Sequence, residues 1–114
     1  MDSSTEPVYV ISVAARLIGV HAQTLRTYER EGLLQPARSR GGVRMYSEAD
    51  IERLQLIRRF MDDLRVNIAG VDVILRLMER TEELEHQLEE IRVELQRARD
   101  KNLPAPRPFD PAGS

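Results

Sequence analysis

Polar and basic side chains suited to contact nucleic-acid bases are concentrated in one short stretch. The members of this cluster are His21, Gln23, Thr24, Arg26 and Thr27. Gln can pair with adenine, Arg can pair with guanine, and the methyl group of Thr can contact the methyl group of thymine. A helix that carries such residues near its N-terminal end is typical of recognition in the major groove. We therefore expect this cluster to contact DNA bases.

Basic residues around a glycine-containing loop form a second candidate site. The loop covers residues 37–43 and leads into a short segment with strand character at residues 44–46. We expect Arg38, Arg40 and Arg44 to reach phosphate groups or the minor groove. A basic loop of this kind after two short helices is typical of a wing.

Two tyrosines adjoin these segments, and we predict that both contact DNA. The hydroxyl of Tyr28 could reach a phosphate, and Tyr46 ends the expected wing strand. Core packing is the alternative for both, because aromatic rings carry a large apolar surface. Two other candidates also have alternatives. Arg26 could pair with Glu29, three residues along the helix, and His21 could be an N-cap or a spacer.

Catalysis and metal binding have few residues to use. The sequence has no Cys, which excludes a disulfide framework, a cysteine zinc site and thiol chemistry. Its two histidines, His21 and His86, have no partner at triad or metal-ligand spacing. The acidic pair Asp62 and Asp63 falls at an expected helix end, where we predict that it is solvated. We therefore expect no enzyme activity, no metal site and no cofactor.

Two short helices must position the base-contacting cluster. A β-branched run at residues 8–11 predicts a short strand. Ser12 is then the expected N-cap of a helix that Gly19 ends. Helical spacing of apolar residues restarts over residues 21–31, and Gly32 ends this second helix. Two short helices separated by a tight turn predict a helix-turn-helix.

Further helices are expected after the wing. Residues 47–50 read Ser-Glu-Ala-Asp and match a capping box, which begins a helix. One face of that helix carries Ile51, Leu54, Ile57, Phe60, Met61 and Leu64. Asn67 is the expected cap of the next helix.

An apolar seam follows with alternating steps of three and four residues, which is the spacing of a coiled coil. The residues that we expect to mediate dimerisation are Leu77, Thr81, Leu84, Leu88, Ile91, Leu95 and Ala98. A helix over residues 79–100 would be about 33 Å long at 1.5 Å per residue. A small domain cannot cover a stripe of that length, so a second chain is favoured over packing within the chain.

The charge distribution separates the front of the chain from the back. Residues 12–61 carry nine Arg against five acidic residues, whereas residues 79–100 carry eight acidic residues against four Arg. The whole chain of 114 residues has a net charge of −2. We therefore expect only the front part to meet a polyanion.

These features predict a mainly α fold, in which a winged helix-turn-helix domain precedes a long coiled-coil dimerisation helix. The predicted parts are a disordered lead at residues 1–7, the DNA-binding domain at 8–78, the coiled coil at 79–100 and a flexible proline-rich tail at 101–114. The N-terminus lacks a secretory signal, and no run of 18 apolar residues occurs. We expect a cytoplasmic protein that does not enter membranes.

Three stretches of the sequence together resemble the MerR family of transcription regulators. They read ISVAARLIGV at residues 11–20, TLRTYEREGLL at 24–34 and GVRMYSEADI at 42–51. The resemblance extends from about Val8 to Met78, with the coiled coil after it. It implies a winged-helix homodimer that is held together by an antiparallel coiled coil and binds double-stranded DNA at an inverted-repeat operator.

Within this family, the sequence is most similar to heat-shock repressors of the HspR type. The stretches that carry this similarity are residues 9–15, 21–26 and 66–71. The similarity implies repression of chaperone operons, with the Hsp70 chaperone DnaK as co-repressor.

The same resemblance implies roles for individual residues. Arg26 and Tyr28 match family positions that touch DNA backbone or bases, the wing arginines match phosphate contacts, and Arg58 matches a basic position on the third helix. Thr27 replaces a second aromatic residue that many family members have, so no aromatic contact is carried over to it.

Two alternative functions stay open at this point. The first is a MerR-type regulator of another regulon that responds to an unidentified ligand. The second is a coiled-coil adaptor whose winged helix binds protein. Because the sequence shows no Cys and no effector region after the coiled coil, we expect a protein partner to be the signal.

Overall fold

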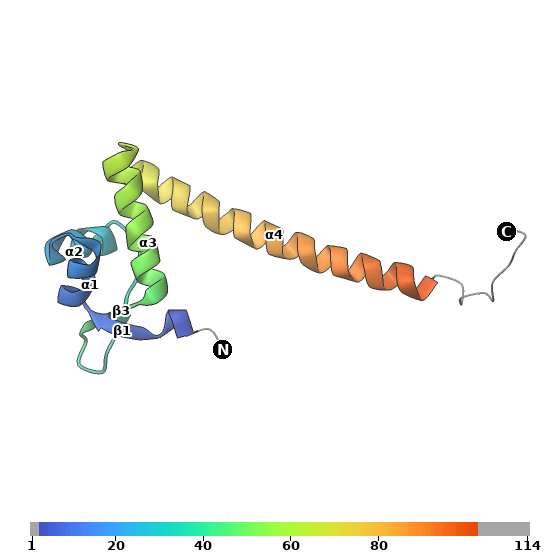
Figure 1. The fold of residues 1–114 in the computed structure, drawn as a ribbon, viewed down its shortest axis with the longest axis horizontal. Helices are drawn as coiled ribbons and strands as arrows, with labels where there is room; N and C mark the ends of the chain where they lie inside the picture. The colour runs from blue at the N-terminus through green and yellow to red at the C-terminus, as the bar shows by residue number, and fades with distance from the viewer. Residues whose placement is uncertain (1–2, 103–114) are drawn as a thin grey trace, which may run out of the picture. The chain divides into compact units, whose positions relative to one another are not determined.

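The structure, a computed structural model, describes residues 3–102 (Figure 1). The chain divides into two compact units, Met1–Leu77 and Met78–Ser114, and each is described by itself. The elements in chain order are η1 (Ser3–Thr5), β1 (Pro7–Val10), α1 (Ile11–Ile18), α2 (Ala22–Arg30), β2 (Ala37–Arg38), β3 (Arg44–Ser47), α3 (Glu48–Arg58), η2 (Arg59–Asp63) and α4 (Ile68–Asn102). The fold is mainly helical with a small sheet, as predicted.

Helices α1 and α2 form the predicted helix-turn-helix. Gly19 ends α1 with a left-handed backbone (φ 83°), and its N–H donates to the carbonyl of Ala15 at 2.8 Å. Residues with a side chain rarely adopt this conformation, which explains the glycine. Leu25 and Tyr28 of α2 are buried in the same core as Ile18 of α1.

Three short strands make one antiparallel sheet in the order β1-β3-β2. Tyr9 pairs with Tyr46 and Val10 with Met45, while Arg38 of β2 pairs with Arg44. The β2–β3 hairpin is the predicted wing. In this hairpin the basic loop leads into β3, and β3 also pairs with β1.

Within the predicted disordered lead, the described residues 3–7 adopt a defined conformation. Residues Ser3–Thr5 form a 3-10 turn, in which the N–H of Glu6 donates to the carbonyl of Ser3 at 3.1 Å. Pro7 begins β1, and a proline is tolerated there because β1 is an edge strand and needs fewer N–H donors. The Tyr9 hydroxyl also donates to the carboxylate of Glu48, which raises the pKa of Tyr9.

Helix α3 begins at the predicted capping box. The hydroxyl of Ser47 accepts from the N–H of Asp50 at 3.1 Å, and the carboxylate of Asp50 accepts from the N–H of Ser47 at 2.9 Å. Ile51, Leu54 and Ile57 are buried, as their spacing predicted. These bonds satisfy N–H groups that the first turn of a helix leaves without partners.

The far end of α3 differs from the prediction. The helix widens into the π-helical turn η2 after Arg58, and Leu64 is 60% exposed instead of lying on the buried face. A π-helical turn rotates the residues that follow it, because each turn takes one more residue than in an α-helix. The predicted face therefore ends before Leu64, while Phe60 and Met61 are partly buried against the core.

A tight junction leads into α4. Arg65 has a left-handed backbone (φ 58°), which is uncommon for a residue with a side chain. Asn67 then caps α4, as predicted, by accepting the N–H of Gly70 at 2.8 Å. A Cβ atom on Gly70 would lie 2.7 Å from the side chain of Val66. The junction thus depends on the absence of a side chain at Gly70.

Helix α4 has 35 residues and includes Lys101 and Asn102, so the prediction that these two residues belong to the tail is wrong. No Gly or Pro interrupts the sequence between Val71 and Asn102, so nothing in it ends the helix earlier. The predicted flexible tail from residue 103 onward lies outside the described residues. Between residues 3 and 102, no helix is both long and apolar enough to cross a membrane.

The predicted coiled-coil residues are exposed. The exposed fractions of Leu77, Leu84, Leu88, Ile91 and Leu95 lie between 47% and 61%, and Thr81 and Ala98 are exposed as well. In the second unit, charged pairs such as Arg80–Glu83 and His86–Glu90 lie along the helix surface. Among residues 3–102, a stripe of large apolar residues is therefore left exposed.

Candidate nucleic-acid interface

Helix α2 divides the predicted base-contacting cluster between surface and core. Gln23 and Arg26 are exposed, while Thr24 and Thr27 are partly buried. His21 lies at the N-cap position in an extended conformation and makes no capping hydrogen bond with its side chain. The helix is held to the core by Leu25 and Tyr28 on its opposite face, so its polar residues are left on the surface.

The hydroxyl of Thr27 is occupied within α2. It donates to the carbonyl of Gln23 at 3.1 Å and accepts from the guanidinium of Arg30 at 3.2 Å. An exposed Arg on a helix usually makes no more than such local contacts. Thr27 therefore orders Arg30 on the surface of α2, and its contact with a base stays a prediction.

Glu29 does not pair with Arg26, which was the alternative for that arginine. Its carboxylate instead accepts from Arg38 at 2.9 Å and from Arg44 at 2.5 Å. The Arg26 guanidinium has no hydrogen bond or ion pair with any residue between 3 and 102. It is therefore available to a partner outside the chain.

A surface hollow of about 470 Å³ lies between α2 and the wing. The residues that line it are Gln23, Arg26, Glu29, Arg30, Gln35 and Arg44. Three arginines and one glutamate make this surface cationic, and the planar guanidinium groups suit both phosphate and guanine. The geometry thus brings two of the predicted base-contacting residues, Gln23 and Arg26, together with one of the predicted wing arginines, Arg44, whereas His21, Thr24 and Thr27 do not line this hollow.

The wing loop is held by its own hydrogen bonds. The N–H of Ser39 donates to Val43 at 2.8 Å, and the N–H of Gly42 donates to Ser39 at 2.9 Å. Gly42 has a φ of 78°, which favours glycine. Arg38 adds a bond from its guanidinium to the carbonyl of Gly42 at 3.3 Å. Arg40 is exposed at the tip of this ordered loop.

Tyr28 and Tyr46 are core residues, and the full burial of Tyr46 corrects its predicted DNA contact. Its side chain is fully buried, and its hydroxyl has no hydrogen-bond partner among the described residues. Burial raises the pKa of Tyr46, and the nearby Glu29 carboxylate raises it further. Tyr28 is 7% exposed, and burial raises its pKa too. Both rings therefore contribute a large apolar surface to the core.

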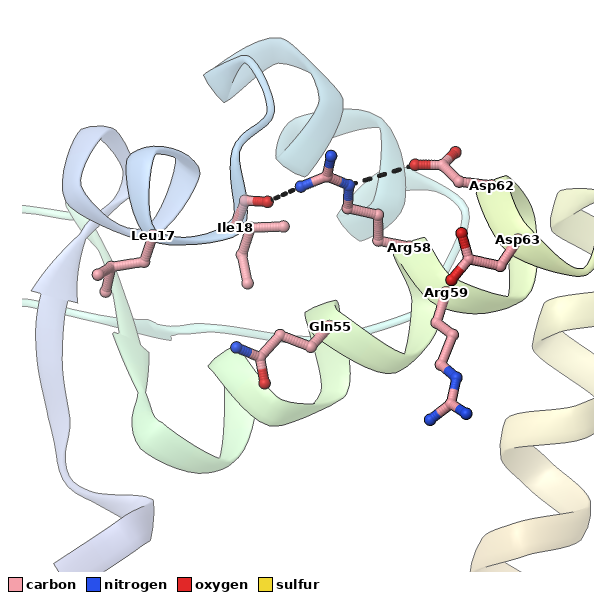
Figure 2. A pocket seen from close by; sticks show the side chains of 7 residues that line it. All are labelled: Leu17, Ile18, Gln55, Arg58, Arg59, Asp62 and Asp63. Carbon is pink, nitrogen blue, oxygen red and sulfur yellow. Dashed lines mark hydrogen bonds and ion pairs between the residues drawn. The ribbon is translucent and has the colours of Figure 1, made fainter.

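Arg58 connects α3 to the end of α1, as Figure 2 shows. Its guanidinium donates to the carbonyl of Ile18 and, at 3.2 Å, to the carboxylate of Asp62. A Cβ atom on Gly19 would lie 2.7 Å from this guanidinium. Arg58 thus satisfies a carbonyl that the helix end leaves free, and its predicted DNA contact stays untested.

Arg58 also lines a second hollow, of about 440 Å³. Arg58, Arg59, Asp62 and Asp63 contribute two positive and two negative charges to its lining, and Leu17 adds an apolar side chain. Arg59 points away from the Arg58–Ile18 contact in Figure 2. The balanced charge gives this hollow no preference for a polyanion, unlike the one beside α2.

Glu29 is the shared partner of two wing arginines, Arg38 and Arg44, and this role was not predicted from the sequence. An acidic residue near the end of an expected recognition helix, followed by a basic loop, is a signal that could have suggested it. The sequence does not show which arginines fold back onto the helix, because that depends on the wing hairpin register.

Comparison with known proteins identifies the family. A family model described as "MerR HTH family regulatory protein" matches residues 9–78. A protein named "Putative heat shock protein HspR" from Streptomyces coelicolor is 46% identical over 85 residues, which are 75% of this chain and 56% of that protein. The chain thus spans little more than half the length of this curated relative.

Solved structures show the same fold. The transcription regulator PbrR691 from Ralstonia metallidurans, in complex with lead(II), has a TM-score of 0.59 and 27% identity, covering 82% of this chain and 79% of that one. HiNmlR, a MerR family regulator that lacks the sensor domain and is bound to promoter DNA, has a TM-score of 0.56 and 24% identity, covering 82% and 76%. Since the family model covers more than half of the sequence, the chain belongs to the MerR family of helix-turn-helix transcription regulators.

Proposed function

We propose that this MerR-family regulator is a sequence-specific repressor of heat-shock (chaperone) operons and binds an inverted-repeat operator as a homodimer. The cationic hollow beside α2 carries the DNA-binding part, because it combines Gln23 and Arg26 with Arg44 in one surface. The 46% identity to the HspR relative supports the heat-shock part. HiNmlR, which shares the fold, is bound to promoter DNA.

The exposed seam of α4 supports the homodimer. The part from Met78 to Asn102 is about 37 Å long at about 1.5 Å per residue. Its apolar residues recur with coiled-coil spacing and are exposed, so pairing with a second copy would cover them. Regulators of this family act as dimers, and two-fold symmetry matches an inverted repeat. We propose an antiparallel coiled coil as the dimer contact.

DnaK is the proposed co-repressor. The support is the similarity to HspR-type repressors, both in the short stretches of the sequence and in the relative from Streptomyces coelicolor. A protein signal of this kind would tie repression to the amount of free chaperone.

A second candidate is a regulator of another regulon that responds to a ligand. The observation that favours it is the structural similarity to PbrR691, which was solved with lead(II). The two candidates share the DNA-binding surface and differ in the target genes and the signal.

A genome-wide pull-down tests both candidates. The purified protein is incubated with fragments of its own genome, with and without DnaK, and the bound fragments are sequenced at several salt concentrations. We expect one inverted repeat ahead of chaperone genes, enriched more strongly with DnaK, and a steep loss of binding with salt. A different repeat that is indifferent to DnaK supports the second candidate. No enrichment, with salt-insensitive capture of protein, points to the adaptor.

A further inference from the structure

We propose that Glu29 is a positioning residue of the DNA interface, which orients Arg44 toward the hollow beside α2 and fastens the wing to the helix. This inference rests on the proposed DNA-binding function. Glu29 itself is not expected to contact DNA, because its carboxylate would repel phosphate.

The contacts of Glu29 join three elements. One carboxylate oxygen accepts from Arg38 of β2 at 2.9 Å, and the other accepts from Arg44 of β3 at 2.5 Å. The Glu29 side chain, on α2, is only 20% exposed. Charge-assisted hydrogen bonds that are partly shielded from water hold geometry better than exposed pairs do. One carboxylate thereby fixes both wing strands relative to the recognition helix.

The two arginines are held in different ways. Arg38 uses both terminal nitrogens within the protein, one for Glu29 and one for the carbonyl of Gly42. Arg44 is held through Nε alone, which leaves its two terminal nitrogens without a partner among the described residues. Arg44 also lines the hollow together with Gln23 and Arg26. Arg38 therefore fastens the wing, while Arg44 keeps the donors that bind a phosphate or a base edge.

The negative charge of Glu29 and its positioning of Arg44 should have different effects on DNA binding, so the two effects can be measured separately. A carboxylate at this surface lowers affinity for every duplex, because it offsets part of the attraction to phosphate. A carboxylate that orients Arg44 raises affinity only for the duplex whose geometry fits. Glu29 should therefore decrease non-specific binding and increase specific binding, which is how a protein gains selectivity.

The test compares Glu29→Gln with Glu31→Gln. Both substitutions remove one negative charge near the C-terminal end of α2, and the Glu31 side chain has no hydrogen bond or ion pair with the residues described. Two duplexes of equal length are used: the one that the wild-type protein enriches from a random library, and a scrambled one. The measured quantity is the dissociation constant for the scrambled duplex divided by that for the selected duplex. This ratio does not depend on the folded fraction of the preparation.

We expect Glu29→Gln to reduce this ratio about tenfold, through tighter binding of the scrambled duplex and weaker binding of the selected one. Glu31→Gln should tighten both and leave the ratio unchanged. Glu29→Asp, which keeps both oxygens and the charge, should recover part of the ratio.

Three results would overturn the inference. A lower Tm with an unchanged ratio would mean that Glu29 is only structural. Equal ratios for the Glu29 and Glu31 variants would mean that charge alone acts. If the wild-type protein enriched no duplex, this result would contradict the proposed DNA-binding function and therefore also the proposed role of Glu29.

Discussion

The two units of the chain differ in the solvent exposure of their regularly spaced apolar residues. In the first unit, Leu25, Leu33, Leu54 and Val71 are fully buried in one shared core. In the second unit, Leu84, Leu88, Ile91 and Leu95 recur just as regularly and are all exposed. The first unit buries its core within one chain, whereas the described part of the second unit, residues 78–102, leaves its apolar face exposed.

The contrast shows that regular spacing alone does not tell a core from an interface. Apolar residues at helical spacing predict that one face of a helix is covered. What covers that face depends on how many other elements the chain brings to it. Short helices and a sheet surround α3, whereas the second unit consists of one long described helix.

The largest expected effect is on the exposed seam. Leu88→Asp places a charge in the proposed dimer contact, so we expect a monomer and a loss of operator affinity of about hundredfold or more, because linked half-sites bind far more tightly than single ones. Analytical ultracentrifugation and DNA-binding titrations check this. Val93→Asp is the matched control, since Val93 is also apolar and exposed but lies off the seam. A dimeric Leu88→Asp variant would place the contact elsewhere.

The next effect concerns the surface of the first unit. Arg26→Ala is expected to cost roughly 1–3 kcal/mol in operator binding and to relax selectivity at one operator position, if Arg26 contacts a base. Binding to operators with single base changes measures this. Arg16→Ala, on the surface of α1, serves as the control. An equal loss on scrambled DNA would instead indicate a phosphate contact.

A smaller effect is expected on the stability of the first unit. Gly19→Ala should lower the free energy of unfolding by about 1–2 kcal/mol, because the left-handed conformation is unfavourable with a side chain. The new Cβ atom would also lie 2.7 Å from the Arg58 guanidinium, which must then move. Chemical denaturation checks the change. Gly41→Ala is the control, since it has open space and no positive φ, and an equal loss there would disprove the explanation.

The smallest effect is expected inside the core. Tyr46→Phe should raise the free energy of unfolding by about 1 kcal/mol, because it removes a buried hydroxyl that has no partner among the described residues. DNA affinity should stay the same. Denaturation and binding titrations measure both, and a loss of affinity with unchanged stability would restore the predicted DNA contact of Tyr46.

Because the pKa of Tyr46 is raised, the stability of the wild type and that of the Tyr46→Phe variant should depend differently on pH. The unfolded chain loses the Tyr46 proton near pH 10, whereas the folded chain keeps it to higher pH. Stability of the wild type therefore falls as the pH rises above about 10. The Phe variant should lose less stability over the same range, as denaturation at pH 9 and pH 11 would show.

The sequence predicted most features that depend on neighbouring residues, although the expected N-cap Ser12 lies inside α1, whose N-cap is Val10. The capping box at Ser47 and Asp50, the helix end at Gly19 and the cap at Asn67 all appeared as expected. Each needs only a side chain and backbone groups within a few positions. For the same reason, the wing and the order of the helices could be predicted.

The missed features depend on contacts between distant segments. The π-helical turn η2 and the left-handed Arg65 have no clear sequence signal, because both result from fitting α3 and the start of α4 onto one core. The burial of Tyr46 depends on pairing between β1 and β3, and the pairing of Glu29 depends on the wing hairpin. No local pattern contains these contacts.

The exposed seam of α4 also makes protein concentration a control variable. If two copies pair through it, as we propose, the dimer forms by mass action, and doubling the protein at low concentration increases the dimer about fourfold. Occupancy of an operator that needs the dimer would then respond more steeply than the expression level itself. Under this proposal, repression would begin only above a threshold amount of protein in the cell.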